Sequence, residues 1–157
     1  MDEYLRCLEA LWTQDPVEFA GEFYTVPRSH VGPPPVQRPH PPVLLGGAAV
    51  PALRRAGRLA QGWICSSRQD LTDLGASIET VRAGAREAGR DPEAVQIVVR
   101  RPLRGTREQV LEELVALRAQ GVTEVFLDLN LSPGVDVDDA GRVLEAFAPA
   151  RRPRPSA

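Results

Sequence analysis

The feature that most constrains the fold of this 157-residue chain is a strict alternation of apolar segments and amphipathic helices after Pro42. Each apolar segment has the length of one strand, and each helix that follows carries apolar residues at helical spacing. The four pairs are Val43–Leu45 with a helix up to Ala60, Trp63–Ser66 with a helix over 70–88, Val95–Val99 with a helix that starts at Thr106 and ends at Gly121, and Val125–Leu129 with a helix over 137–147. This alternation predicts an α/β fold with a parallel sheet and right-handed crossovers.

Local signals indicate where two of these helices begin and end. The second helix has one apolar stripe, formed by Leu71, Leu74, Ile78, Val81 and Ala85. Gly89 follows this stripe and is a typical helix stop. Thr106 and Gln109 have the spacing of a capping box, which predicts the start of the third helix, and Gly121 ends it.

The segment before Pro42 has a different character. Asp2–Thr13 has the apolar spacing of an amphipathic helix, although no capping residue precedes it. Residues 17–26 alternate in polarity around Ala20 and Gly21, which predicts a β-hairpin. Residues 27–42 contain seven prolines and are expected to form an extended connector with little regular structure.

Two architectures are compatible with four strand–helix units: a doubly wound open sheet and part of a (β/α)8 barrel. Four units and a lead segment make up a little over half of the roughly 250 residues of a full barrel. An isolated arc has two open edges and an unfilled interior. Sequential strand order with all helices on one side indicates the arc, whereas reversed order with helices on both faces indicates the open sheet. We expect one domain over 1–148, divided into 1–41 and 42–148, and a disordered tail over 149–157.

Composition excludes several classes of function. The net charge of -2 argues against nucleic-acid binding, and the short apolar runs argue against a membrane span, so a cytoplasmic protein is expected. All 19 cationic side chains are arginine, which excludes Schiff-base chemistry on a lysine amine. Cys7 and Cys65 lack the spacing of a metal site or a disulfide framework, and His30 and His40 have no acidic or cysteine cluster beside them.

The glycine turn after the first apolar segment is a candidate anion site. Gly46, Gly47, Ala48 and Ala49 connect a strand to a helix that has Pro51 near its start. Backbone N–H groups at such a turn point to one place beside the positive end of the helix dipole, where a phosphate binds well. The alternative is that the glycines only permit a tight turn.

Polar residues near the ends of the other strands are weaker candidates. Ser66 and Ser67 are expected to contact a cofactor or substrate, or else to start the loop and cap the next helix. Arg100 and Arg101 are expected to follow the third strand, where one of them meets an anionic group or is solvated. A further candidate pair, for acid–base chemistry or for a turn, is Asp128 with Asn130. Trp63 is expected to be a core residue.

Several motifs together resemble the luciferase-like monooxygenase superfamily. They are Asp2–Leu5 with Leu11–Thr13, Pro16–Tyr24, Gly32–Pro33 with Pro35–Gln37, Pro41–Gly47, Ala52–Ala56 with Leu59–Ala60, and Gly62–Trp63. The similarity is greatest to the branch that uses the deazaflavin coenzyme F420, and it extends to about Phe147.

This resemblance implies the C-terminal half of a (β/α)8 TIM-type barrel, preceded by a helix, a β-hairpin insertion and a proline-rich connector. It also implies a truncated flavin- or deazaflavin-dependent oxidoreductase that transfers a hydride to or from a small organic substrate, or oxygenates it. Coenzyme F420 is the implied cofactor and FMN the alternative, with its phosphate held partly by Gly46, Gly47 and Ala48. The family's catalytic residues would lie in the absent half, so none is assigned here.

Two other classes of function remain open. One is a non-catalytic half-barrel that folds by pairing with another chain, either a second copy or the missing barrel half, because four strands leave unpaired edges and an exposed inner face. The other is an independent open α/β binding domain.

Overall fold

The structure of the chain is a computed structural model that describes residues 1–66, 69–129 and 140–147. The chain divides into two compact units, Met1–Val43 and Leu44–Ala157.

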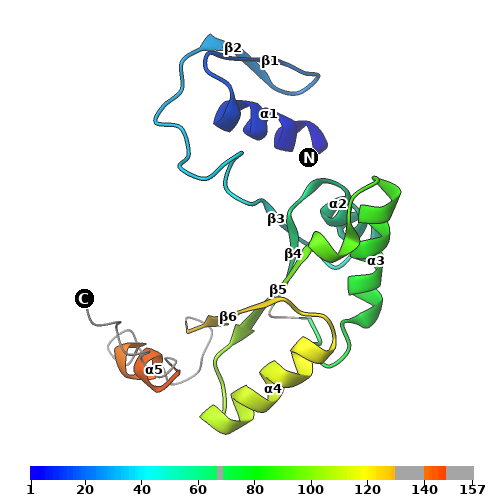
Figure 1. Ribbon diagram of the computed structural model, residues 1–157, viewed down its shortest axis with the longest axis vertical. Coiled ribbons are helices and arrows are strands. Elements are labelled where there is room, and N and C mark those ends of the chain that lie inside the picture. The colour runs from blue at the N-terminus through cyan, green and yellow to red at the C-terminus, as the bar shows by residue number, and fades with distance from the viewer. Residues whose placement is uncertain (67–68, 130–139, 148–157) are drawn as a thin grey trace, which may run out of the picture. The chain divides into compact units, whose positions relative to one another are not determined.

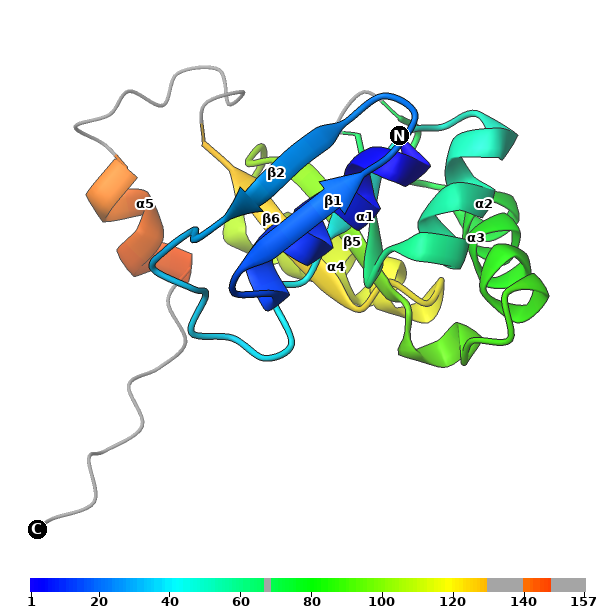
Figure 2. The same ribbon diagram turned by 90° about the horizontal axis from the view of Figure 1, so that it is seen from above.

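The first unit is a helix with a β-hairpin. Helix α1 (Asp2–Thr13) has the predicted bounds. Strands β1 (Val17–Ala20) and β2 (Thr25–Ser29) pair antiparallel, as predicted, and Figure 2 shows them beside α1. The second strand extends to Ser29, so the expectation that the irregular connector begins at Pro27 is wrong. A proline is tolerated there because β2 is an edge strand, whose outer N–H groups need no ladder partner.

A buried carboxylate joins the helix to the hairpin turn. Glu3 is only 8% exposed, and its carboxylate accepts hydrogen bonds from the backbone N–H groups of Glu22, Phe23 and Tyr24 at 2.8–3.0 Å. Desolvation alone would raise the pKa of Glu3, but these three donors outweigh it and lower the pKa below its usual range. Gly21 makes room for this contact, because a Cβ there would lie 2.1 Å from Glu3 Oε1.

The second unit is a four-stranded parallel sheet with its connecting helices (Figure 1). Its elements in chain order are β3 (Leu44–Gly46), α2 (Val50–Leu59), β4 (Gly62–Cys65), α3 (Gly75–Glu87), the 3-10 helix η1 (Pro92–Ala94), β5 (Gln96–Pro102), α4 (Arg107–Ala119), β6 (Glu124–Asp128) and α5 (Ala140–Phe147). The strands lie in the sequential order β3-β4-β5-β6, and all neighbours are parallel. The predicted parallel α/β fold is therefore confirmed.

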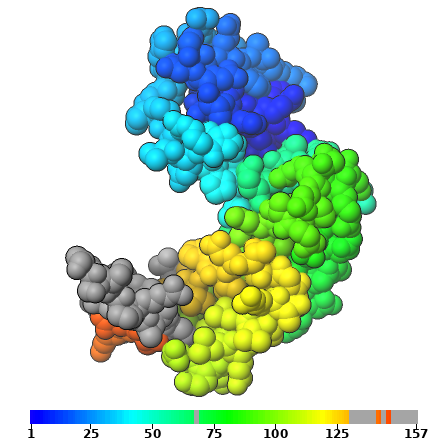
Figure 3. Space-filling model, viewed as in Figure 1, coloured from blue at the N-terminus to red at the C-terminus, as the bar shows by residue number. Residues whose placement is uncertain are grey.

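One face of this sheet is covered by α2, α3 and α4. A single buried cluster joins residues of that face with residues of the three helices: Trp63, Cys65, Ile97 and Val99 from the sheet, and Leu53, Ile78, Val81 and Leu117 from the helices. Figure 3 shows the same region as a continuous mass of atoms from the green of α3 to the yellow of α4. Sequential order with helices packed on one face favours the barrel arc over the doubly wound sheet.

Two glycines bring α2 and α3 into close contact. A Cβ on Gly57 would lie 1.8 Å from the Val81 carbonyl oxygen, and one on Gly84 would lie 2.4 Å from that of Arg54. The backbones approach each other here, and Figures 1 and 2 both show the two helices side by side. Neither site tolerates even an alanine without movement of the backbone.

Helix α3 begins at Gly75 and not near residue 70, so the predicted start is wrong by about one turn. The Asp70 carboxylate accepts from the backbone N–H and the hydroxyl of Thr72, at 2.9 and 2.7 Å. The Asp73 carboxylate accepts from the N–H of Gly75 at 3.2 Å. These local hydrogen bonds compete with helical ones and hold the segment in turns. Leu71 still packs against the core, but from outside the helix.

Strand β5 extends to Pro102, so the expectation that Arg100 and Arg101 follow the strand is wrong. The reason is that β6 supplies ladder partners along this whole length, up to the pair of Pro102 with Asp128. The capping box of Thr106 and Gln109 is confirmed, as is the helix end at Gly121, which has a φ of +97°. The predicted start of the last helix, at 137–139, and the predicted tail over 149–157 lie outside the described residues.

We expect Glu3→Gln to destabilise the hairpin and to lower the melting temperature by several degrees at pH 7. The lowered pKa of Glu3 means that its stabilisation is complete above the pKa of the unfolded chain and is lost as the pH falls through the folded-state pKa. Chemical unfolding monitored from neutral to acidic pH measures this loss. The exposed Glu9 of the same helix provides the matched control Glu9→Gln. An acid-induced loss of stability that is equal in Glu3→Gln and wild type would contradict the role of this carboxylate.

Candidate functional site

The turn between β3 and α2 has a conformation that requires one of its glycines. Residues 46–50 are exposed. Gly47 has a φ of +127°, and a Cβ there would lie 2.7 Å from the Cβ of Ala52. Gly46 has ordinary space around its Cβ position, with Ile64 O at 3.7 Å. The tight turn therefore depends on Gly47 alone.

The start of α2 presents unused backbone donors to solvent. The first hydrogen bonds of the helix run from the N–H groups of Ala52 and Leu53 to Ala49 O, at 2.8 and 3.0 Å. In the described part of the chain, the N–H groups of residues 48, 49 and 50 have no acceptor. Exposed, unpaired N–H groups at a helix N-terminus are the donors with which proteins bind phosphate.

Trp63 lies beneath this turn. It is fully buried, so the predicted core position is confirmed. Its indole Nε1–H donates a 2.8 Å hydrogen bond to the carbonyl oxygen of Gly47. Sequence reasoning missed this bond, because nothing in the local pattern links a strand residue to a turn sixteen residues earlier.

The two consecutive arginines of β5 face opposite sides of the sheet, because successive side chains of a strand alternate. Arg101 lies on the helix-covered side with 7% exposure, is paired with Glu113 and donates to Pro102 O at 2.8 Å. Arg100 lies on the other side, level with Phe126 of β6. Of the two residues, only Arg100 lies on the face of the sheet opposite α2, α3 and α4, where its side chain is partly exposed.

Arg100 is held by a buried carboxylate near the carboxyl end of the sheet. Its Nε donates to Asp128 Oδ2 at 2.6 Å, and its Nη2 is also paired with that oxygen. The side chain of Asp128 is 2% exposed, whereas that of Arg100 is 41% exposed and lies 5.9 Å from the centre of the Phe126 ring. This geometry orients the guanidinium and leaves part of it open to solvent. The pairing of Asp128 with Arg100 could not be recognised from the sequence, in which 28 residues separate them.

The end of β4 carries the remaining described candidate. Ser66 is exposed directly after the strand, and its carbonyl oxygen accepts from the N–H of Gln69 at 3.0 Å. Ser67 and Asn130 lie outside the described residues. The neighbouring Cys65 is fully buried, and burial raises the pKa of its thiol to about 11. At neutral pH this cysteine is protonated and is not a nucleophile.

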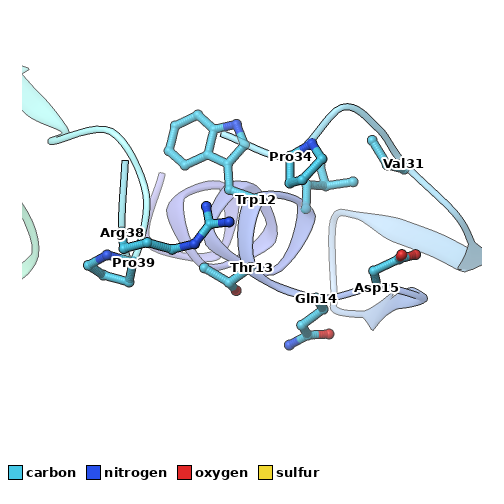
Figure 4. A pocket seen from close by; sticks show the side chains of 9 residues that line it. Trp12, Thr13, Gln14, Asp15, Val31, Pro34, Arg38 and Pro39 are labelled. Atoms are coloured by element: carbon cyan, nitrogen blue, oxygen red, sulfur yellow. The ribbon is translucent and has the colours of Figure 1, made fainter. Parts of the chain in front are cut away.

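The first unit contains a separate hollow of about 350 Å³ between the end of α1 and the proline-rich segment. Figure 4 shows Trp12, Pro34 and Arg38 around it. The rings of His40 and Trp12 have centres 5.6 Å apart and are tilted. Asp15 also lines the hollow, and its Oδ1 lies 2.7 Å from His30 Nδ1. Within the described ranges, no three His, Cys, Asp or Glu side chains come together as metal ligands. The same part of the chain contains no helix that is both long and apolar enough to cross a membrane.

Comparison with known proteins identifies one relative that is named for FMNH(2) and another that is named for F420. The chain is 32% identical over 120 residues to the FMNH(2)-dependent dimethylsulfone monooxygenase of Pseudomonas putida, which is 73% of this chain and 32% of that protein. It is 37% identical over 99 residues to the F420-dependent glucose-6-phosphate dehydrogenase of Gordonia bronchialis, which is 62% of this chain and 28% of that protein.

Among solved structures, the fold is similar to that of an F420-dependent secondary alcohol dehydrogenase in complex with an F420-acetone adduct. The TM-score is 0.75 at 17% identity, over 93% of this chain and 59% of the other. In all three comparisons the chain spans less than two thirds of the other protein. The model of the luciferase-like monooxygenase family matches residues 1–151. The chain therefore belongs to the luciferase-like monooxygenase family.

Proposed function

We propose that this chain is the cofactor-phosphate-binding part of a flavin- or deazaflavin-dependent oxidoreductase that acts on a small organic substrate. The observation that carries the proposal is the turn at Gly46, Gly47, Ala48 and Ala49, which follows a parallel strand and presents exposed backbone N–H groups at a helix start. Coenzyme F420 is the first choice of cofactor, and FMN is the alternative. The relative from Gordonia bronchialis, which is named for F420, supports the first choice, and the relative from Pseudomonas putida, which is named for FMNH(2), supports the alternative.

The residues of the turn fit a phosphate group. Gly47 allows the backbone to turn where a side chain would collide with Ala52. The donors of Ala48, Ala49 and Val50 lie beside the positive end of the α2 dipole, so they favour an anion without any cationic side chain. When bound, the cofactor supplies the redox chemistry. The contribution of this chain is to hold the phosphate and to present Arg100, and also Ser66 and Ser67, to an adjoining cofactor or substrate group.

We also propose that the four strands are one arc of a (β/α)8 barrel, corresponding to its C-terminal half. The sequential strand order, the single helix-covered face and the length of the relatives support this assignment. In such a barrel the turn and Arg100 face the mouth at the carboxyl ends of the strands, where active sites of this fold lie. The rest of the site would come from the remaining strands.

We expect the purified chain to bind F420 or FMN detectably but only weakly, because it holds only part of the site. Titration with each cofactor, followed by cofactor fluorescence, measures this affinity. Riboflavin is the matched control ligand for FMN because it lacks the phosphate, and it is expected to bind more weakly still. Sub-micromolar binding with full turnover would contradict the partial-site proposal, and equal affinity for FMN and riboflavin would contradict the phosphate turn.

Arg100→Gln is expected to lower the free energy of unfolding by about 2 kcal/mol, because the buried Asp128 loses its cation. The double variant Arg100→Gln with Asp128→Asn removes the buried charge and should recover part of this loss. Urea unfolding of both variants measures the two effects.

The double variant also tests whether Arg100 contacts the cofactor, because the second substitution is expected to preserve the fold. We expect it to bind FMN or F420 about tenfold more weakly than wild type, as for a lost charge-assisted contact. The exposed Arg104 offers the control Arg104→Gln, which should leave the affinity unchanged. Unchanged binding by the double variant would exclude Arg100 from the cofactor site.

A second candidate function, a non-catalytic half-barrel that pairs with another chain, is favoured by exposed apolar surface at β6. Phe126 is 49% exposed on the face of the sheet opposite α2, α3 and α4. A hollow of about 730 Å³ also runs between α4 and β6, lined by Leu114, Val125 and Leu127 among others. Apolar surface of this kind beside an open strand edge is usually covered by a partner.

We therefore expect the purified chain to self-associate or to require a partner for stable folding. Sedimentation velocity over a range of concentrations distinguishes these states. A monomer that unfolds cooperatively at all concentrations would contradict the pairing hypothesis.

A further inference from the structure

We infer that Trp63 is a positioning residue for the phosphate turn: its indole N–H fixes the Gly47–Ala48 peptide so that the Ala48 N–H faces the ligand. This inference rests on the proposed function, because it concerns the same turn. In this role Trp63 acts through the turn and not by contact with the cofactor, whereas its place in the sequence indicates only a core residue.

The position of Trp63 follows from the sheet register. Trp63 of β4 is the ladder partner of Leu45, one residue before Gly46 in β3. Its side chain is fully buried on the helix-covered face. A buried indole N–H needs an acceptor, and Gly47 O at 2.8 Å provides it.

This bond sets the direction of the next donor. In a trans peptide the C=O and the following N–H are rigidly linked and point in opposite directions. The C=O of Gly47 points to the buried indole, so the N–H of Ala48 points away from it. Ala48 is exposed, and its N–H has no acceptor among the described residues.

The turn needs such a restraint because glycine supplies none. Gly47 has a φ of +127°, in a region that only glycine adopts without strain, and glycine also moves easily between positive and negative φ. Without the indole bond, rotation of the Gly47–Ala48 peptide would turn its carbonyl oxygen toward an anion and repel it. The hydrogen bond therefore pre-organises the donors before the ligand arrives, which lowers the cost of binding.

Trp63→Phe tests this role, since it keeps an aromatic ring in the core and removes the N–H. Trp12 is the only other tryptophan of the chain, so Trp12→Phe is the matched control. Amide NMR spectra are recorded for each protein during titration with FMN, riboflavin and inorganic phosphate. We expect the amide signals of residues 48–50 in wild type and Trp12→Phe to shift with FMN and phosphate.

In Trp63→Phe we expect FMN and phosphate to bind about five- to tenfold more weakly, as for the loss of one orienting hydrogen bond, while riboflavin binding is unchanged. A general structural defect would instead weaken all three ligands or shift amide signals throughout the sheet. In wild type, the Trp63 indole N–H should also exchange slowly with D₂O.

A second variant tests the same inference if the Trp63→Phe protein does not fold. In the Trp12→Phe background, tryptophan is replaced biosynthetically by benzothienylalanine, which has sulfur in place of the N–H at nearly the same volume. Unchanged FMN and phosphate affinities in this protein would overturn the inference and leave the phosphate turn standing. Absence of any shift at residues 48–50 in the wild type would overturn the phosphate turn itself, and the role of Trp63 with it.

Discussion

The structure of the second unit depends on the need of parallel strands for cover on both faces. One face meets this need within the chain, where Trp63, Ile97 and Val99 pack under α2, α3 and α4. On the other face, Phe126 stays half exposed and Arg100 forms its ion pair. A closed barrel satisfies the same requirement by turning that face inward. The asymmetry between the two faces therefore connects the fold to the proposed site.

Sheet register places the candidate groups at one edge from different strands. Gly46 of β3 pairs with Ile64 of β4, and Ile64 pairs with Val98 of β5. Arg100 therefore lies two residues closer to the carboxyl end of β5 than the residue in register with Gly46. Asp128 is level with Pro102, two residues beyond Arg100. None of these positions follows from one segment alone. The site is produced by the parallel alignment of β3, β5 and β6.

The sequence predicted those features that depend on neighbouring residues. The alternation after Pro42 predicted the parallel sheet, and Thr106 with Gln109 predicted the start of α4, because periodicity and capping act within a few residues. The start of α3 was missed because the hydrogen bonds of Asp70 compete with the helix. The length of β5 and the Arg100–Asp128 pair were missed for a different reason: they depend on β6, which the order of residues along β5 does not reveal.

The cation of the Arg100–Asp128 pair is a guanidinium, as is every cationic side chain of this lysine-free sequence. A guanidinium has five N–H donors in a planar fork, and Asp128 engages those of Nε and Nη2 on one side. The planar group therefore keeps a fixed orientation and still offers its other side to an anion. A lysine ammonium is a single point charge, and a buried carboxylate would neutralise it without orienting a free edge. The same reasoning applies at the turn, where the proposed anion would be bound by backbone donors without a mobile side chain. The proposed anion recognition thus relies on rigid donors, and we expect the residues that hold those donors in place, such as Trp63 and Asp128, to matter as much as the donors themselves.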